Sequence, residues 1–213
     1  YLNQSGKSDG HHKDLSAIRR HLFLMNLIED PLHTGLYTET EPWNWKEPQE
    51  EMLEDLVKRM GKLMLEKNGI GLAANQIHKP YRIFVMRWME ERQIKAFINP
   101  MIVNTSDEVV LMEEGCLSYP GFWTKVKRPA EVRIRFANHL GEVDTIQLSG
   151  LAARVAQHEI DHLDGVRWYK RASPIHNDRA KNKKKKMDRI RKKNAEKTEI
   201  PNTKISLDEI SLA

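Results

Sequence analysis

Residues 151–165 read LAARVAQHEIDHLDG, and this stretch decides what to expect of the rest of the chain. Apolar residues and histidines recur in it at helical spacing. One face of the predicted helix consists of Leu151, Val155, His158 and His162. Gly165 follows the periodic residues, as is usual just past the end of a helix. We therefore predict a helix over residues 151–163 that buries both histidines in the core.

His158, Glu159 and His162 form the pattern HExxH. Histidines four residues apart lie about one turn apart on the same helix face, so both can bind one metal ion while Glu159 reaches a water bound to it. A single buried histidine usually satisfies its hydrogen bonds within the core. Two histidines at this spacing beside a carboxylate favour a metal site instead.

A catalytic site of this kind needs a third protein ligand and an open coordination position. Metzincin proteases have a third histidine six residues after the second, where this chain has Trp168. Thermolysin-like proteases have a glutamate about twenty residues later, where residues 181–186 are almost all lysine. The sequence completes neither protease pattern.

The chain has one cysteine, Cys116, in the segment EGCLS at residues 114–118. A lone cysteine is most often an inert buried residue. A thiolate together with two imidazoles is, however, a suitable ligand set for a divalent transition metal and leaves one position for water. We therefore predict that Cys116, His158 and His162 hold one divalent metal ion.

A third segment, GIGLAANQ at residues 69–76, contains two glycines. It follows a predicted helix, lacks the third glycine of a dinucleotide loop and lacks the Walker lysine, so it does not indicate a nucleotide cofactor. Two interpretations remain. The segment is either a loop that ends a helix or a backbone that approaches a substrate closely, with Gln76 supplying an amide donor.

The other elements predict an α+β fold with short, mostly antiparallel strands around the HExxH helix. An N-terminal amphipathic helix is expected over residues 48–67, and a nearly all-polar helix is expected from Pro174 to about Asn194. Strands are expected over residues 81–88, 96–98, 101–103, 132–136 and 143–148.

Charge is distributed unevenly over the 213 residues, whose formal net charge is +5. Residues 179–193 contain ten Lys or Arg and one Asp, a local charge of +9, so the remainder carries −4. Such a run is either a solvated face or an arm for a polyanion. We divide the chain into a mobile extension (1–24), a catalytic domain (25–173), a basic helix or arm (174–194) and a flexible tail (195–213).

The composition also limits where the protein acts. No stretch approaches the eighteen consecutive apolar residues of a membrane span, so no membrane association is expected. A single cysteine cannot form an internal disulfide, which suits a reducing compartment such as the cytoplasm. The chain begins with Tyr1, and Met25 is a possible translation start.

The segments GIGLAANQ, EGCLS and QHEIDH, in this order, together resemble the peptide deformylase family, as do INP at residues 98–100 and HLDG at residues 162–165. The resemblance implies that Cys116, His158 and His162 bind the metal and that Glu159 is the general acid and base. It also implies that Gln76 and the backbone amide of Leu117 stabilise an oxyanion. The implied metal is iron(II), with zinc, nickel or cobalt as alternatives.

The implied substrate is the formyl group of N-formylmethionine at the start of a nascent polypeptide, released as formate. The methionine side chain needs an apolar pocket beside the metal. The residues that we expect around the substrate are Ile70, Gly71, Gly115, Leu151 and Val155. The chain departs from the family's commoner pattern at His78 and at Gly121, Phe122 and Trp123, which leaves open how the peptide beyond methionine is bound.

The basic segment resembles the C-terminal helix by which bacterial deformylases dock near the ribosomal exit tunnel. The residues that we assign to ribosome binding are Arg179, Lys183, Lys184, Lys186, Arg189 and Arg191. The alternative is a solubilising tail.

Two other function classes compete with a co-translational deformylase. The first is a zinc peptidase or other amidase with the same ligands, and the missing protease ligands argue against it. The second is a ribosome- or RNA-binding module with a vestigial site, and retention of every ligand and of Glu159 argues against that. A cytoplasmic location is expected, in a bacterium or in the host of a virus, with an organelle as a further alternative.

Overall fold

The computed structural model of the chain describes residues 26–49, 51–88 and 93–198. The predicted extension over residues 1–24 and most of the predicted tail lie outside these residues. The helices are α2 (Leu53–Glu66), α3 (Gly150–Leu163) and α4 (Pro174–Thr198), with 3-10 turns η1 (Thr34–Tyr37), η2 (Ala74–Ile77) and η3 (Trp168–Arg171). The strands are β1 (Gly71–Ala73), β2 (Ile83–Trp88), β3 (Gln93–Thr105), β4 (Val109–Cys116), β5 (Tyr119–Pro129), β6 (Glu131–Ala137) and β7 (Val143–Ser149).

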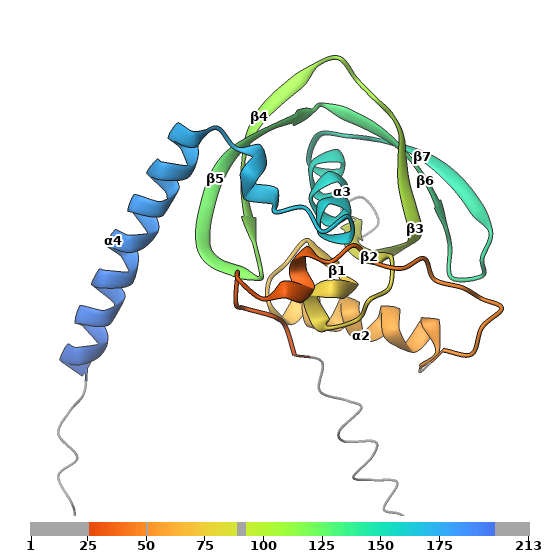
Figure 1. Cartoon of the computed structure of the whole chain (residues 1–213), viewed down its shortest axis with the longest axis horizontal. Coiled ribbons are helices and arrows are strands. Elements are labelled where there is room, and N and C mark those ends of the chain that lie inside the picture. The colour runs from red at the N-terminus through yellow and green to blue at the C-terminus, as the bar shows by residue number, and fades with distance from the viewer. Residues whose placement is uncertain (1–25, 50, 89–92, 199–213) are drawn as a thin grey trace, which may run out of the picture.

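The strands form two antiparallel sheets around α3. Five strands pair in the order β1-β2-β3-β6-β7, and β4 pairs with β5 in a separate hairpin. Helix α3 lies between the five-stranded sheet and the hairpin. Helix α2 lies on the far side of β1 and β2 from α3 (Figure 1). The predicted α+β class, with antiparallel strands around a central helix, is confirmed.

Strand β2 explains how two helices share one sheet. Ile83 and Val85 belong to the apolar cluster around α2, whereas Phe84 and Met86 belong to the cluster under α3. Successive side chains of a strand point to opposite faces, so this strand is buried on both. That is why its sequence is a continuous apolar run rather than an alternating one.

Helix α3 is buried on all sides over most of its length, whereas the sequence predicts burial of one face. Every residue from Ala153 to Leu163 is buried, including Arg154, Gln157 and Asp161. Leu151, at the start of the predicted stripe, is 44% exposed because the first turn of α3 faces a cavity rather than the core.

Several predicted strands differ from the observed ones. Residues 96–98 and 101–103 belong to one strand, β3, because the break at Asn99 and Pro100 is absorbed as a shift in register beside Asn99, whose φ is +50°. Strand β1 and the whole β4–β5 hairpin were not predicted. The helix expected over residues 48–67 begins only at Leu53.

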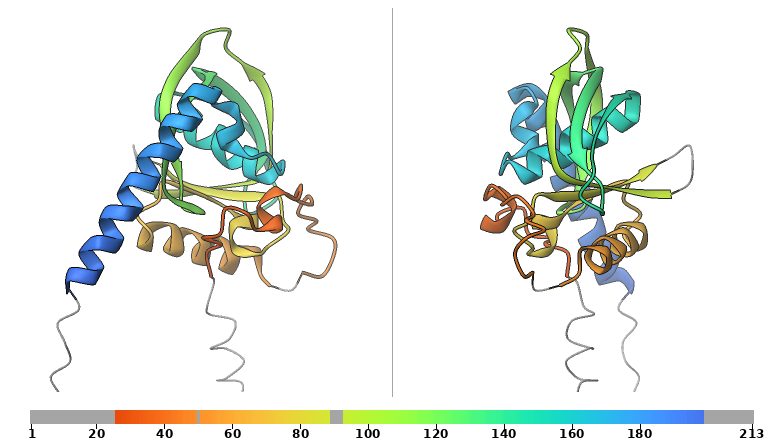
Figure 2. Two further views of the ribbon diagram at one scale, coloured as in Figure 1. Left: turned by 60° about the vertical axis from the view of Figure 1, so that its left-hand side comes forward. Right: turned by 90° about the vertical axis from the view of Figure 1, so that its right-hand side faces the viewer.

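The predicted basic helix is present as α4, which extends four residues beyond its expected end. Its first turns are anchored by Ala180, which is buried with Phe122, Val126 and Trp168. Beyond this contact the helix leans away from the body (Figure 2). Among the described residues, no helix is long and apolar enough to cross a membrane.

The C-terminus of α3 is closed by Gly165, as predicted. Gly165 N donates to the carbonyl of His162 (3.1 Å), and Val166 N donates to the carbonyl of Asp161 (2.7 Å), which together form a Schellman motif. Gly165 has a φ of +66°, and a Cβ there would lie 2.7 Å from the Tyr37 carbonyl oxygen. Both conformation and space therefore require glycine.

We expect Gly165→Ala to destabilise the fold more than Gly150→Ala. Gly150 also has a positive φ (+56°), but a Cβ there would meet no heavy atom of the described residues within 4 Å. Gly150→Ala should therefore cost about 1 kcal/mol, and Gly165→Ala should cost at least about 1 kcal/mol more because backbone atoms must move. Urea unfolding of both variants measures the difference, and equal losses would contradict the steric argument.

Candidate metal centre

The end of β4 and the C-terminal half of α3 bring the three predicted ligands together. One ligand atom each from Cys116, His158 and His162 lies within 4.8 Å of the others. Cys116 Sγ is 3.2 Å from His162 Nε2, and the two imidazole rings are 5.1 Å apart. His158 and His162 are 42 and 46 residues from Cys116 in the chain, and the three predicted ligands thus converge on one point that a metal ion could occupy.

His158 is held in one orientation by Glu114. Its Nδ1 donates to Glu114 Oε2 (3.0 Å), which leaves Nε2 to face the ligand cluster. Glu114 in turn accepts from Arg128 at both oxygens (2.7 and 2.9 Å) and from Arg154 Nη1 (2.8 Å). A carboxylate behind a histidine ligand fixes its tautomer and increases its basicity.

The sequence alone predicts no role for these supporting residues. Glu114 is the first residue of the EGCLS segment, and its place two residues before Cys116 is the one local signal that it supports the site. Arg128 and Arg154 are 14 and 40 residues away from Glu114, and no local pattern connects them. Asp161 extends the network because it accepts from Arg128 (2.7 Å) and from Arg171 (2.7 Å).

The electrostatics of the cluster favour a cation. Burial opposes ionisation of Glu114, but hydrogen bonds from His158 and Arg128 hold its pKa well below the usual range. Burial also opposes protonation of His158, but its hydrogen bonds with Cys116 and Glu114 raise its pKa to about 10. A thiol and a carboxylate therefore stabilise positive charge here.

His162 is suited to coordinate as a neutral imidazole. Burial, together with the charge of His158, lowers its pKa well below the usual value. Its buried Nδ1 has no hydrogen-bond partner among the described residues, and its Nε2 faces the sulfur. A thiolate, a neutral imidazole and an oriented second imidazole fit a divalent transition metal.

Glu159 lies beside the cluster in a buried position. Burial and the charge of Glu114 raise its pKa to about 7, against the opposing effects of His158 and Arg128. Its Oε2 is buried without a hydrogen-bond partner in the described part of the chain. Gly71 allows this placement, because a Cβ there would clash with Glu159 Oε1 and lie 2.7 Å from Val155 Cγ1.

The side-chain amide of Gln76 points toward the same cluster. Its Oε1 accepts from Ala73 N (2.8 Å), which fixes which end of the amide faces the site. Its Nε2 donates to Ser118 Oγ (3.1 Å) and lies 3.5 Å from Cys116 Sγ. The structure thus places an oriented N–H donor within reach of the predicted metal position.

A cavity of about 510 Å³ opens beside the ligands. Its wall contains every residue that the sequence analysis assigned to substrate or proton transfer: Ile70, Gly71, Gln76, Gly115, Leu117, Leu151, Val155 and Glu159. Arg154 and Trp123 also line it, although neither was predicted to. The candidate ribosome-binding residues do not line it; they lie on α4.

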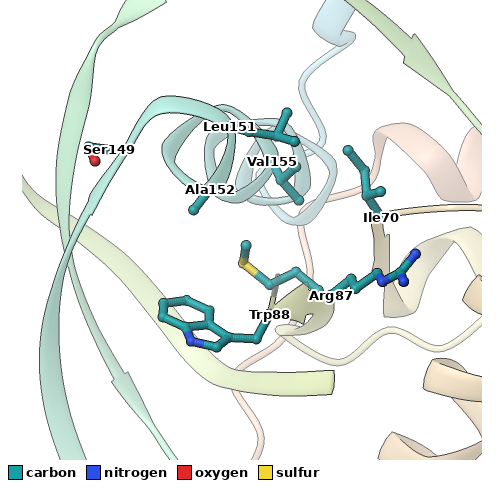
Figure 3. A pocket seen from close by; sticks show the side chains of 8 residues that line it. Ile70, Arg87, Trp88, Ser149, Leu151, Ala152 and Val155 are labelled. Carbon is teal, nitrogen blue, oxygen red and sulfur yellow. The ribbon is translucent and has the colours of Figure 1, made fainter. Parts of the chain in front are cut away.

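A smaller hollow of about 200 Å³ shares Ile70, Leu151 and Val155 with this cavity. Figure 3 shows Leu151 and Val155 on α3 opposite Ile70, with Trp88 and Arg87 of β2 beside them. The first turns of α3 therefore form a wall of both spaces.

Comparisons with known proteins agree with this geometry. The family model described as polypeptide deformylase matches residues 26–178. The chain is 37% identical over 172 residues to peptide deformylase 1 of Burkholderia multivorans, covering 80% of this chain and 93% of that one. It is 39% identical over 164 residues to the peptide deformylase of Neisseria gonorrhoeae, covering 76% of this chain and 95% of the relative.

Solved structures are similar as well. A plant peptide deformylase superposes with a TM-score of 0.69 at 32% identity, covering 83% of this chain and 94% of the other. A peptide deformylase from Synechococcus elongatus in complex with actinonin has a TM-score of 0.69 at 29% identity, covering 75% and 87%. The matched regions include both α3 and the EGCLS segment within residues 26–178. The chain therefore belongs to the polypeptide deformylase family of metallohydrolases, which remove the formyl group from nascent polypeptides.

Proposed function

We propose that the chain performs this deformylation with Cys116, His158 and His162 holding one divalent metal ion. The observation that carries the proposal is the convergence of their three ligand atoms within 4.8 Å at the edge of a large cavity. A bound divalent ion would lower the pKa of a water and polarise the formyl carbonyl. We assign iron(II) first, and zinc, nickel or cobalt suit the same sulfur and nitrogen donors.

Glu159 moves the proton in this proposal. Its Oε2 takes a proton from the attacking water and delivers it to the amine nitrogen as the bond between carbon and nitrogen breaks. The water's oxygen ends in formate, and the peptide leaves with a free amino terminus. The buried position of Glu159 beside the cavity and its pKa of about 7 support exchange of a proton in both directions.

Gln76 and the backbone amide of Leu117 stabilise the negative oxygen that develops during attack. Donors fixed before the reaction are effective because they need no reorganisation when charge appears. The hydrogen bond from Ala73 N to Gln76 Oε1 supplies this fixation for the side-chain amide.

The methionine side chain occupies the apolar part of the cavity. Ile70, Leu151 and Val155 line it there, and Gly71 and Gly115 belong to the same cavity wall. Of these, Val155 is buried and Leu151 is half-exposed, which places Leu151 at the mouth.

We also propose that α4 docks on ribosomal RNA in a reducing compartment such as the cytoplasm. The assigned cations on α4 are exposed, except for the half-buried Lys184. Lys and Arg contacts with phosphates gain free energy from counterion release. The anchoring of α4 through Ala180 supports a fixed arm rather than a loose tail.

We expect Glu159→Gln to retain the metal and to lose at least about a hundredfold in kcat, because an amide cannot accept the proton. Formate release from a formyl-Met peptide, with the metal measured in the same sample, tests this. Glu47→Gln, at an exposed position, is the matched control and should keep normal turnover. Near-normal activity of metal-loaded Glu159→Gln would remove Glu159 from the mechanism.

Cys116→Ala should purify without stoichiometric metal, because the site loses its thiolate and keeps two ligands. Cys116→Asp should bind metal with its preference shifted toward ions that favour oxygen ligands. Elemental analysis of both proteins, with thermal unfolding to check the fold, measures these effects. Stoichiometric metal in folded Cys116→Ala would show that the third ligand lies elsewhere.

Neutralising the exposed cations of α4 should weaken ribosome binding without changing hydrolysis of a short peptide. The variant replaces Lys183, Lys186, Arg189 and Arg191 with Gln. If each contacts a phosphate, the slope of log affinity against log salt should fall by about four. Substitution is cleaner than truncation after Ser173, because truncation would also remove the buried Ala180.

Cosedimentation with ribosomes across a salt series gives the slope. The control variant replaces four exposed cations on other elements with Gln: Lys58, Lys62, Lys127 and Arg133. Equal loss in both variants, or loss in neither, would argue for a solubilising helix.

A further inference from the structure

Trp123 is a large aromatic side chain that stays exposed at the mouth of the catalytic cavity. It is 52% exposed and lines the 510 Å³ cavity. Along β5 the side chains of Phe122, Thr124 and Val126 point inward and are buried, so Trp123 projects from the outer face. An exposed tryptophan beside a cavity is a typical contact for a ligand.

The indole lies against the Cα of Gly115. These two residues are paired across the hairpin, and a Cβ on Gly115 would lie 2.7 to 2.8 Å from three atoms of the ring. Any other residue at position 115 would displace the indole. One side of the ring is thus supported by β4, which holds the ring in place before a ligand binds. Binding therefore costs little side-chain entropy at Trp123.

Other apolar side chains are exposed at the same mouth. Ile70 and Leu151 are 39% and 44% exposed and line the cavity with Trp123. The exposed charges nearby are paired: Lys67 Nζ lies 2.7 Å from Glu29 Oε1, and Lys183 Nζ lies 4.0 Å from Glu113 Oε1. The mouth therefore offers apolar contact rather than a net charge to a peptide.

The position of the ring relative to the metal ligands decides which part of a substrate it meets. The indole lies against Gly115, and Gly115 directly precedes the proposed ligand Cys116 in the chain. An extended peptide advances about 3.3 to 3.6 Å per residue. If the formyl group lies at the metal, the residues that follow methionine in an extended peptide reach the indole.

We propose that Trp123 is a specificity-determining residue that binds an apolar or aromatic side chain at the second or third position of the formylated peptide. The inference rests on the proposed function, because that function places the formyl group beside Cys116. Stacking or edge contact with a supported indole favours such side chains over small polar ones.

The test compares kcat/KM for three substrates: formyl-Met-Ser-Ser, formyl-Met-Phe-Ser and formyl-Met-Ser-Phe. We expect the unmodified metal-loaded protein to prefer at least one phenylalanine peptide by about 3- to 10-fold, mainly through KM. Trp123→Ala should abolish the preference, so that the phenylalanine peptides and formyl-Met-Ser-Ser have equal kcat/KM. Trp123→Phe should retain part of it.

Trp45→Ala is the matched control, because Trp45 is 42% exposed and does not line the catalytic cavity. It should keep the full preference. Equal rates on all three peptides, or an unchanged preference in Trp123→Ala, would overturn the inference while leaving the proposed function intact. No formate from any peptide would overturn the proposed function and this inference with it.

Discussion

The structure depends on the burial of one carboxylate, that of Glu114, between two guanidinium groups and an imidazole. Arg128, Arg154 and His158 all contact it within 3.0 Å, and each of these groups is nearly inaccessible to solvent. Buried charges are tolerated only when paired, and removing one partner from such a network costs about 3–5 kcal/mol. Because the partners come from β4, β5 and α3, this network fixes the hairpin on the helix and orients His158, a proposed metal ligand, by the same contacts.

Two glycines beside that network make room for side chains that line the cavity. Gly71 lets β1 approach Glu159 without a clash, and Gly115 lets the indole of Trp123 lie against β4. The first contact lies inside the cavity and the second at its mouth. At both positions the space that a Cβ would fill is taken by a side chain that lines the cavity, Glu159 in one case and Trp123 in the other.

Local spacing made the candidate metal site predictable, whereas the residues that support it could not be predicted. His158 and His162 are one turn apart, and the chain offers a single cysteine, so few combinations had to be weighed. Strands β4 and β5 escaped prediction because polar residues, Glu114 and Arg128 among them, occupy inward positions. Alternation of apolar and polar residues is the usual signal for a half-buried strand, and an inward-facing ion network erases it. The partners of that network are known only once the fold brings distant residues together.

Strand β5 links the catalytic cavity to the basic helix. Its inward residues Phe122 and Val126 pack with Ala180 of α4, and its inward Arg128 holds Glu114. Its outward Trp123 lies at the mouth of the cavity. Because alternate side chains of a strand are fixed on opposite faces, a shift of one residue in the pairing of β4 with β5 would reverse all of these positions together. The orientation of α4, the orientation of His158 and the shape of the mouth are therefore set by a single register, in which Gly115 lies opposite Trp123.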